Sequence, residues 1–438
     1  MCKSATNKST ASSSKPESLR VDNRGYKSDG KHWASSYDPY DKSVELPSKA
    51  QIKASIPKEC FERSAVHSFY FVFRDTAWAI ACAYLAHTYL STSMPPLLSF
   101  DFIIWSVGWN LYAFWMGTIL TGHWVLAHEC GHNAFSSSRL LNDCVGYVLH
   151  QALLVPYFAW QYSHAKHHRR TNNLVDGESH VPSTKEENGL GPNGEKISHY
   201  AMLHEWMGDG FFAGFQIFTH LVIGWPIYLM GLASTGRIGA DGKPLGSDVP
   251  DHYRPYSRMF PSRIKHKILA STVGILGLLG LLTKLSFDHG FLPVALYYWG
   301  PYMWTNAWLV LYTWLQHNDP SVPQYGEDEW TWVRGALSTI DRPYWIFDYF
   351  HHKIGSTHVA HHLFHEMPFY KADVATAAVK EFLGPLYNYD PTPFPVAMWR
   401  VANTCHYVDS IDGIQYPRSI NDSPPGLVKP EDSKAKRA

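Results

Sequence analysis

The sequence has few charged residues and no arrangement of cysteines that would hold a small fold together. Charged residues make up 17% of the 438 positions, against about 25% in soluble domains. The net charge is zero, so no overall field draws the chain to nucleic acid. The six cysteines are scattered without a C-x-x-C pair, which argues against a disulfide framework and suits a reducing compartment. A charged start followed by an apolar stretch is also missing, so we expect no secretory signal peptide.

Apolar residues, by contrast, make up 45% of the chain and aromatic residues 15%, and they gather in long runs. A membrane crossing takes about 20 residues. Four runs have a suitable length: 69–90, 97–126, 268–285 and 291–315. The polar segments 1–48 and 416–438 are expected to be tails, the first of them disordered, on either side of one domain over residues 49–415.

Basic residues indicate which side of a membrane each connecting segment faces, because cytoplasmic loops carry Lys and Arg. The segments 127–210 and 234–267 are rich in basic residues, whereas the loops 91–96 and 286–290 have none. The sequence therefore predicts an all-α integral membrane protein. Its four transmembrane helices form two hairpins, a helical cap lies in the cytosol, and both termini are cytosolic.

Two further apolar runs need a different place. The run 211–233 lies between the two basic segments, so it is expected to be re-entrant or to lie in the interface, broken at Pro226. An alternative topology has six spans, with the run 147–160 also crossing. That alternative would put the histidine clusters described next on opposite sides of the membrane.

Histidine is abundant, with 25 residues, and its arrangement is unusual. Residues three or four apart share a face of a helix, and three clusters have this spacing: His128/His132, His164/His167/His168 and His358/His361/His362. Ten other histidines are expected to be ordinary surface or core residues: His87, His150, His180, His199, His204, His220, His252, His266, His289 and His406.

A ninth candidate ligand, His317, follows the last apolar run, and the predicted topology places all nine imidazoles on one cytosolic face. Imidazole is a common ligand of transition metals. Eight or nine ligands are too many for one metal and suit two. An all-imidazole set without thiolate fits iron better than a structural zinc site.

The remaining histidines near the clusters are not counted as ligands. His351 and His352 are adjacent in sequence and do not face one partner on a helix. His123 is expected to be packed within its helix, and His365 at most to touch a ligand.

Glu129 opens a rival interpretation, because His128-Glu129-x-x-His132 also matches the helix of zinc metalloproteases. A membrane metalloprotease would leave six clustered histidines without a role, whereas a two-metal site uses all of them and leaves Glu129 to orient an imidazole. A non-enzymatic metal or haem protein of the membrane would hold its ligands within the spanning helices, and here they lie outside them.

These residues resemble a known family. His128-Glu-Cys-Gly-His132, His164-x-x-His167-His168 and His358-x-x-His361-His362 resemble the three histidine boxes of membrane-bound fatty-acid desaturases. The segments 54–63, 335–342 and 367–370 are similar to the microsomal oleate Δ12 (omega-6) branch, and 164–182 to its algal, diatom-type members. The resemblance covers roughly residues 50–415.

The resemblance implies that two iron ions activate O2 and that a cis double bond enters a fatty acyl chain, with conversion of oleate to linoleate on membrane lipid as the expected reaction. It marks the nine histidines as iron ligands. Omega-3 and bifunctional desaturases and related hydroxylases share the boxes, so these alternatives stay open.

The resemblance also implies partners and a location. Electrons would come from cytochrome b5 and its NADH-dependent reductase as separate proteins, because the chain has no His-Pro-Gly-Gly haem signature. The expected location is the endoplasmic reticulum membrane, and Lys434 and Lys436 resemble a dilysine retrieval signal.

Overall fold

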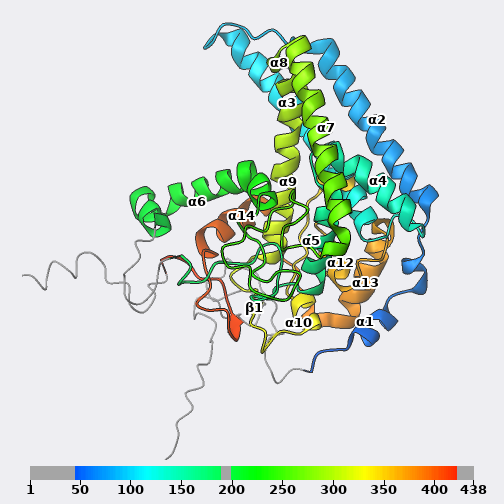
Figure 1. Cartoon of the computed structure of the whole chain (residues 1–438), viewed down its shortest axis with the longest axis vertical. Coiled ribbons are helices and arrows are strands. Elements are labelled where there is room, and N and C mark those ends of the chain that lie inside the picture. The colour runs from blue at the N-terminus through cyan, green and yellow to red at the C-terminus, as the bar shows by residue number, and fades with distance from the viewer. Residues whose placement is uncertain (1–44, 189–198, 422–438) are drawn as a thin grey trace, which may run out of the picture.

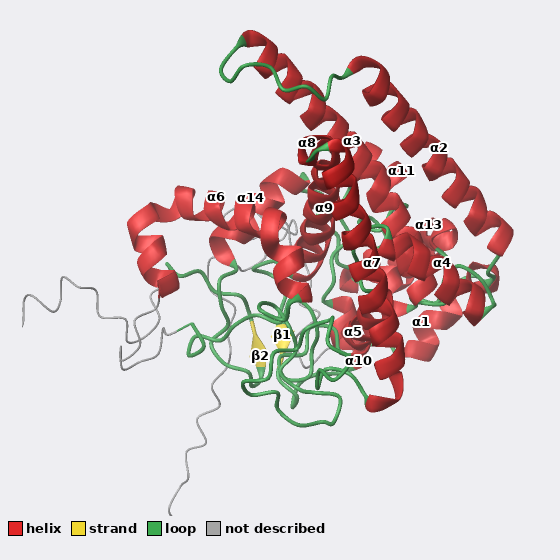
Figure 2. Cartoon of the chain, turned by 45° about the horizontal axis from the view of Figure 1, so that its top comes forward, coloured by secondary structure: helices red, strands yellow, loops and turns green. Residues whose placement is uncertain are grey.

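The computed structural model describes residues 45–188 and 199–421, and helices dominate its regular structure (Figure 2). Most of the two predicted tails lies outside these residues, as do Lys434 and Lys436. The α-helices are α1 (Lys49–Ser55), α2 (Ala65–Tyr89), α3 (Phe100–Gly131), α4 (Arg139–Gln151), α5 (Tyr157–Arg169), α6 (His199–Leu229), α7 (Lys265–His289), α8 (Phe291–Val294), α9 (Gly300–His317), α10 (Trp332–Leu337), α11 (Ile346–Phe350), α12 (His358–Leu363), α13 (Ala372–Leu383) and α14 (Phe394–Thr404).

Shorter elements complete the chain. A π-helical turn, η4 (Ala295–Trp299), joins α8 to α9, and the 3-10 turns are η2 (Lys58–Phe61), η3 (Ser262–Ile264), η5 (Phe369–Lys371) and η6 (Gly384–Leu386). The strands β1 (Gln324–Tyr325) and β2 (Ile414–Gln415) pair antiparallel, with Gln324 opposite Gln415. This small sheet ties the segment after α9 to the last described residues.

Two long helical hairpins project from the rest of the molecule (Figure 1). One is α2 with α3, and the other is α7 with the continuous α8–η4–α9 segment. Large apolar side chains such as Phe73, Ile80 and Leu276 are exposed on them. Each of the four runs predicted to span is therefore helical, and their exposed apolar surface suits lipid better than water.

Length and composition select a partly different set of candidate spans. Among the described residues, three stretches are long and apolar enough to cross a membrane: Phe100–Gly131, Tyr200–Leu229 and Ser262–His289. The set includes α6 and leaves out α2 and α9. Figure 1 shows α6 lying across the direction of the two hairpins. The four-span topology stays a prediction.

The predicted break of the fifth apolar run at Pro226 is wrong. Helix α6 continues through Pro226 to Leu229, and the amide of Met230 still donates to the Pro226 carbonyl over 3.0 Å. A proline near a helix end removes one hydrogen bond, and packing of α6 against α9 and α14 compensates. The break lies instead at Gly208, whose φ of 71° suits glycine.

The run 147–160 is not one helix. It consists of the end of α4, a connection that contains Pro156, and the start of α5. The side chain of Gln151 donates to the Ser271 carbonyl on α7 over 3.0 Å. An interrupted segment of this length does not provide a membrane crossing, so the structure does not support the alternative with six spans.

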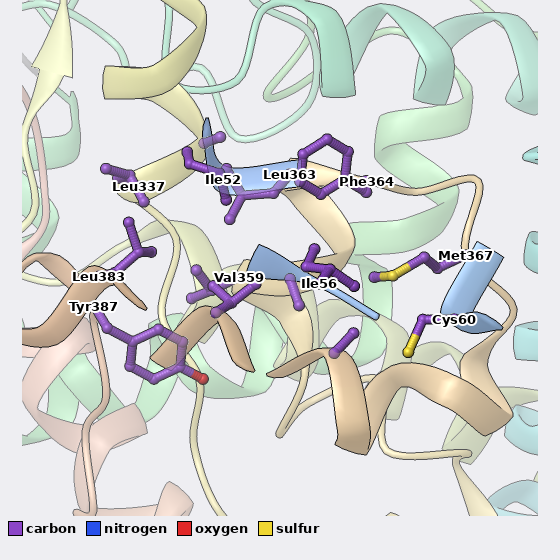
Figure 3. Close-up of a cluster of buried hydrophobic side chains, with 14 residues drawn as sticks. Ile52, Ile56, Cys60, Leu337, Val359, Leu363, Phe364, Met367, Leu383 and Tyr387 are labelled. Atoms are coloured by element: carbon purple, nitrogen blue, oxygen red, sulfur yellow. The ribbon is translucent and has the colours of Figure 1, made fainter. Parts of the chain in front are cut away.

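The cap below the hairpins has its own apolar core, which fixes the third histidine cluster. Side chains of α12 pack against α1, α10 and α13, with Ile52, Val359 and Leu363 at the centre (Figure 3). Since α12 has only six residues, it is too short to be stable alone, and this burial holds it in position.

Candidate metal centre

The first histidine cluster lies at the end of α3. His128 and His132 stand one turn apart, and their Nε2 atoms are 3.2 Å apart. Between them, Gly131 lets α5 approach closely, because a Cβ atom there would meet the Trp160 ring at 2.8 Å. The helix period and this close approach together bring the first cluster against the second.

The second cluster, on α5, faces two ways. His164 and His168 are four residues apart, and their Nε2 atoms are 3.1 Å apart. His167 points to another neighbour, with its Nε2 3.1 Å from Nε2 of His317. Its Nδ1 donates to the Glu178 carbonyl over 2.7 Å, which leaves Nε2 as the free ligand atom.

The third cluster is oriented by a carboxylate at the start of α12. The amide of Val359 donates to Asp341 Oδ1 over 2.8 Å, and the Tyr387 hydroxyl donates to the other carboxylate oxygen. Burial raises the pKa of Asp341 to about 7, against these hydrogen bonds. At the other end of the helix, Nδ1 of His362 lies 3.0 Å from the Thr171 hydroxyl.

His317 is held by a cluster of four buried charges, which we call the charge network: Asp319, Arg342, Asp390 and Arg400. Arg400 contacts Asp319 at 2.6 Å, and Arg342 contacts Asp390 at 3.1 Å. Arg342 also donates to the Leu315 carbonyl, two residues before His317. Because paired charges tolerate burial, the network fixes the end of α9.

The nine histidines come together in two adjoining groups. The larger group contains His128, His132, His164, His168 and His361, and the smaller contains His167, His317 and His362. Within each group the candidate ligand atoms lie within 4.8 Å of one another. His358 adjoins the smaller group, with its Nε2 3.1 Å from Nε2 of His317. The structure thus brings together every histidine selected from the sequence.

The two groups suit metal ions chemically. Burial, followed by the neighbouring imidazoles, lowers the pKa of His164, His168 and His361 well below its ordinary value, and burial lowers that of His167 to about 4. These rings are therefore neutral and can ligate. Nε2 of His361 and of His362 is buried and has no hydrogen-bond partner in the described parts of the chain. In the part of the chain that the structure describes, no cysteine joins either group.

Glu129 lies at the edge of the larger group. One carboxylate oxygen accepts from the Phe369 amide over 2.9 Å, and the other is 3.3 Å from Nδ1 of His128. The carboxylate therefore lies beside the His128 ring, although Nδ1 of His128 forms no hydrogen bond with any described residue. His365 is close as well, with its ring centre 4.7 Å from that of His132 and 4.9 Å from that of His168.

His351 and His352 belong to neither group. His351 lies between the Tyr312 hydroxyl at 2.8 Å and the Thr118 carbonyl at 3.0 Å. His123 is buried in α3 and contacts the Thr76 hydroxyl at 3.1 Å.

An apolar cavity reaches the metal centre between α5, α6 and α9. Its volume is about 200 Å³, below the roughly 300–1,000 Å³ of sites that enclose a drug-sized ligand. Three tryptophans line it, Trp124, Trp160 and Trp225, together with His164 of the larger group. His180 also lines it, with its ring stacked 6.2 Å from that of His317. One end of the cavity therefore lies between the two histidine groups.

The groups that position the ligands were not apparent from the sequence. Asp341 and Arg342 fall within a segment noted for its resemblance, but nothing there showed their contacts. His180 was expected to be ordinary and instead faces the cavity. Asp341 and Arg342 are adjacent charged residues in a chain with few charges. This rarity was the one sign in the sequence that they have a special role.

Known proteins show extensive similarity to this chain. A family model described as fatty acid desaturase matches residues 103–392. A delta-12 fatty acid desaturase of Vernicia fordii is 40% identical over 83% of this chain and 88% of its own length. An omega-6 fatty acid desaturase of Glycine max, an endoplasmic reticulum isozyme, is 41% identical over the same shares. An oleoyl-12-hydroxylase of Ricinus communis is 38% identical over 83% of this chain and 87% of its own.

Proposed function

This chain belongs to the fatty acid desaturase family, and we propose that it inserts a cis double bond at the Δ12 position of an oleoyl chain to form linoleoyl on a membrane lipid. The observation that carries the proposal is the meeting of eight histidines in two groups, with His358 beside them, at one end of an apolar cavity. Cleavage of unactivated C–H bonds is beyond side-chain acid–base chemistry, so the reaction needs a metal cofactor.

The proposed cofactor is a pair of iron ions, one in each histidine group. When bound, iron would supply the activation of O2 that the reaction requires. Protein groups orient the ligands: the Glu178 carbonyl holds His167, the Thr171 hydroxyl contacts His362, and Glu129 contacts His128. Such contacts fix the ring orientation and the ligating nitrogen.

The acyl chain is proposed to lie in the cavity between α5, α6 and α9. The aromatic and aliphatic lining binds methylenes and excludes water. His164 and His180 at the inner end mark where the reacting carbons would lie, because these two side chains connect the cavity with both histidine groups. Regiochemistry then follows from how far the chain enters the cavity.

In the membrane, the two hairpins are proposed to span the bilayer, with both termini and the metal centre on the cytosolic side. The direction of the hairpins and their exposed apolar side chains support this topology (Figure 1). Helix α6 would lie in the interface, since both segments that flank it are basic. The endoplasmic reticulum is the proposed location, supported by the name of the Glycine max relative.

The electron donor is proposed to be cytochrome b5 with its NADH-dependent reductase. Each double bond consumes two electrons. The chain has no His-Pro-Gly-Gly haem signature of its own, so the electrons would come from another protein. A protease function remains the rival from a different class. It would use His128, Glu129 and His132 and leave the other seven candidate histidines without a role.

Expression in a yeast that makes no polyunsaturated fatty acids tests the proposal. We expect linoleate to accumulate in the yeast membranes, and His361→Ala expressed at the same level serves as the inactive control. Accumulation of a hydroxylated oleate would instead favour the activity named for the Ricinus relative. Conversion of added linoleate without conversion of oleate would indicate an omega-3 enzyme. Active wild-type protein with stoichiometric zinc and no loss on iron chelation would contradict the iron centre.

A further inference from the structure

A narrow cavity touches the larger histidine group on another side. It is lined by His361 of that group and by Glu129, and also by His352 and Thr357. The cavity has room for about one water molecule, and its polar lining offers the partners that a buried water needs. No acyl chain fits there, so this space calls for an explanation separate from substrate binding.

His352 is built into a buried ion pair beside this cavity. Its Nε2 lies 2.7 Å from Asp75 Oδ2, and Arg74 holds the other carboxylate oxygen at 2.6 Å. His352 is 4% exposed and Asp75 is 2% exposed. With Nε2–H donated to a carboxylate, Nδ1 is the nitrogen left for another partner. Nδ1 is buried and has no hydrogen-bond partner among the described residues.

The surrounding backbone is shaped to allow this pair. His352 has a φ of 53°, a left-handed conformation that costs energy and persists only where its surroundings enforce it. On α3, Gly122 makes room for the pair: a Cβ atom there would lie 2.5 Å from the Phe350 carbonyl oxygen and 3.0 Å from Asp75 Oδ2. A histidine that only packs against its neighbours would need neither the left-handed backbone nor the space at Gly122.

We propose that His352 delivers protons to the metal centre through a water molecule held in this cavity. The proposal rests on the function proposed above. Desaturation combines O2, two hydrogens from adjacent methylenes, two electrons and two protons to give a double bond and two waters. The cytochrome donor supplies the electrons, and solvent must supply the protons to a site that excludes bulk water. His352 would donate from Nδ1 while Asp75 retains the Nε2 hydrogen bond.

The charges around His352 suit this role. Asp75 and Arg74 face it from α2, Glu129 lies across the cavity on α3, and His123 is the nearest other titratable group of α3. Lys353, next in the chain, is engaged with Asp373. The hydrogen bond from Nε2 to the Asp75 carboxylate fixes the ring and leaves Nδ1 as the nitrogen that can exchange a proton.

His352→Gln tests the proposal. The glutamine amide can still donate to Asp75, but it cannot carry a proton. We expect kcat to fall by about 10²- to 10⁴-fold with an unchanged KM for the lipid, more NADH consumed per double bond and a larger solvent isotope effect. The matched control is His351→Gln, a buried neighbour whose two nitrogens are already engaged. Rates normalised to bound iron should stay normal in that control.

A structural readout is independent of turnover. A high-resolution structure of the zinc-loaded protein should show an ordered water within hydrogen-bond distance of His352 Nδ1, and His352→Gln should lose or displace it. If His352→Gln does not accumulate, His352→Asn replaces it, because Asn tolerates the left-handed backbone well.

Either of two results overturns the inference: normal coupling and kcat in the His352 variants, or a dry cavity in the wild-type structure. Loss of iron in proportion to the loss of rate would show that the pair only supports the fold. Wild-type protein that forms no double bond would instead contradict the proposed function itself.

Discussion

The two histidine groups are assembled by different means. In the larger group, four of the five members form pairs four residues apart, His128/His132 on α3 and His164/His168 on α5. In the smaller group, His167, His317 and His362 come from three separate helices. The helix period pairs four ligands of the larger group in advance, although α3, α5 and α12 must still pack together to complete it. In the smaller group no two ligands share a helix, so every contact depends on the packing of α5, α9 and α12.

Single ligand substitutions give the largest expected effect. His128→Ala and His361→Ala in the larger group, and His167→Ala in the smaller, should each abolish desaturation while protein levels stay near normal. The reason is that both metal ions are needed, whereas the ligands contribute little to membrane insertion. Fatty-acid analysis and immunoblotting in the yeast strain measure the two quantities. Substantial activity in any two variants would show that the ligands are wrongly assigned.

Arg342→Met should weaken metal binding by the smaller group and leave the larger group intact. Removing one member of a buried ion cluster costs about 3–5 kcal/mol, and here the loss loosens the end of α9 that carries His317. We expect bound iron to fall toward one ion per chain, with the larger group retained. The control is Arg418→Met, which removes an exposed pair with Asp409 worth at most about 1 kcal/mol. Equal loss of both ions would mean that the groups do not form independently.

Glu129→Gln should reduce desaturation activity by a smaller amount, and it should act only on the larger group. A carboxylate that orients a metal-bound imidazole typically contributes about 10- to 100-fold to affinity or activity. Reduced but measurable desaturation is therefore expected, with iron still bound. A complete loss of turnover in an iron-loaded variant would assign the carboxylate a more direct role and would revive the comparison with metalloproteases.

Mild acid should have the smallest effect for each residue involved. It should lower the stability of the metal-free protein through the buried histidines of both groups alike. The pKa of His167 in the folded protein is lowered to about 4, and an unfolded histidine titrates near about 6.5. The unfolded chain binds more protons between these values, so stability is full above pH 6.5 and falls as the pH drops toward 4. From pH 7.5 to 6.0, His167 alone should cost less than about 1 kcal/mol of stability, and the other buried histidines add to this loss. Unfolding of the metal-free protein in detergent at a series of pH values measures it, and a gain in stability on acidification would contradict the sign.

The same contrast explains how much the sequence could predict. The spacing of His164 and His168 is visible in one helix turn, and the apolar runs predicted the helices of both hairpins. The contact of Asp75 with His352 and that of Asp319 with Arg400 join positions far apart in the chain, and no local pattern encodes them. The error at Pro226 has the same origin, because packing of α6 on α9 outweighed a local preference.

The charge network has a consequence for how the protein is made. Synthesis proceeds from the N-terminus, and every ligand of the larger group has left the ribosome soon after His361. Asp390 and Arg400, which hold the end of α9, emerge only later, after all the long helices. The end of α9 that carries His317 is thus fixed only after all nine candidate ligands have been synthesised.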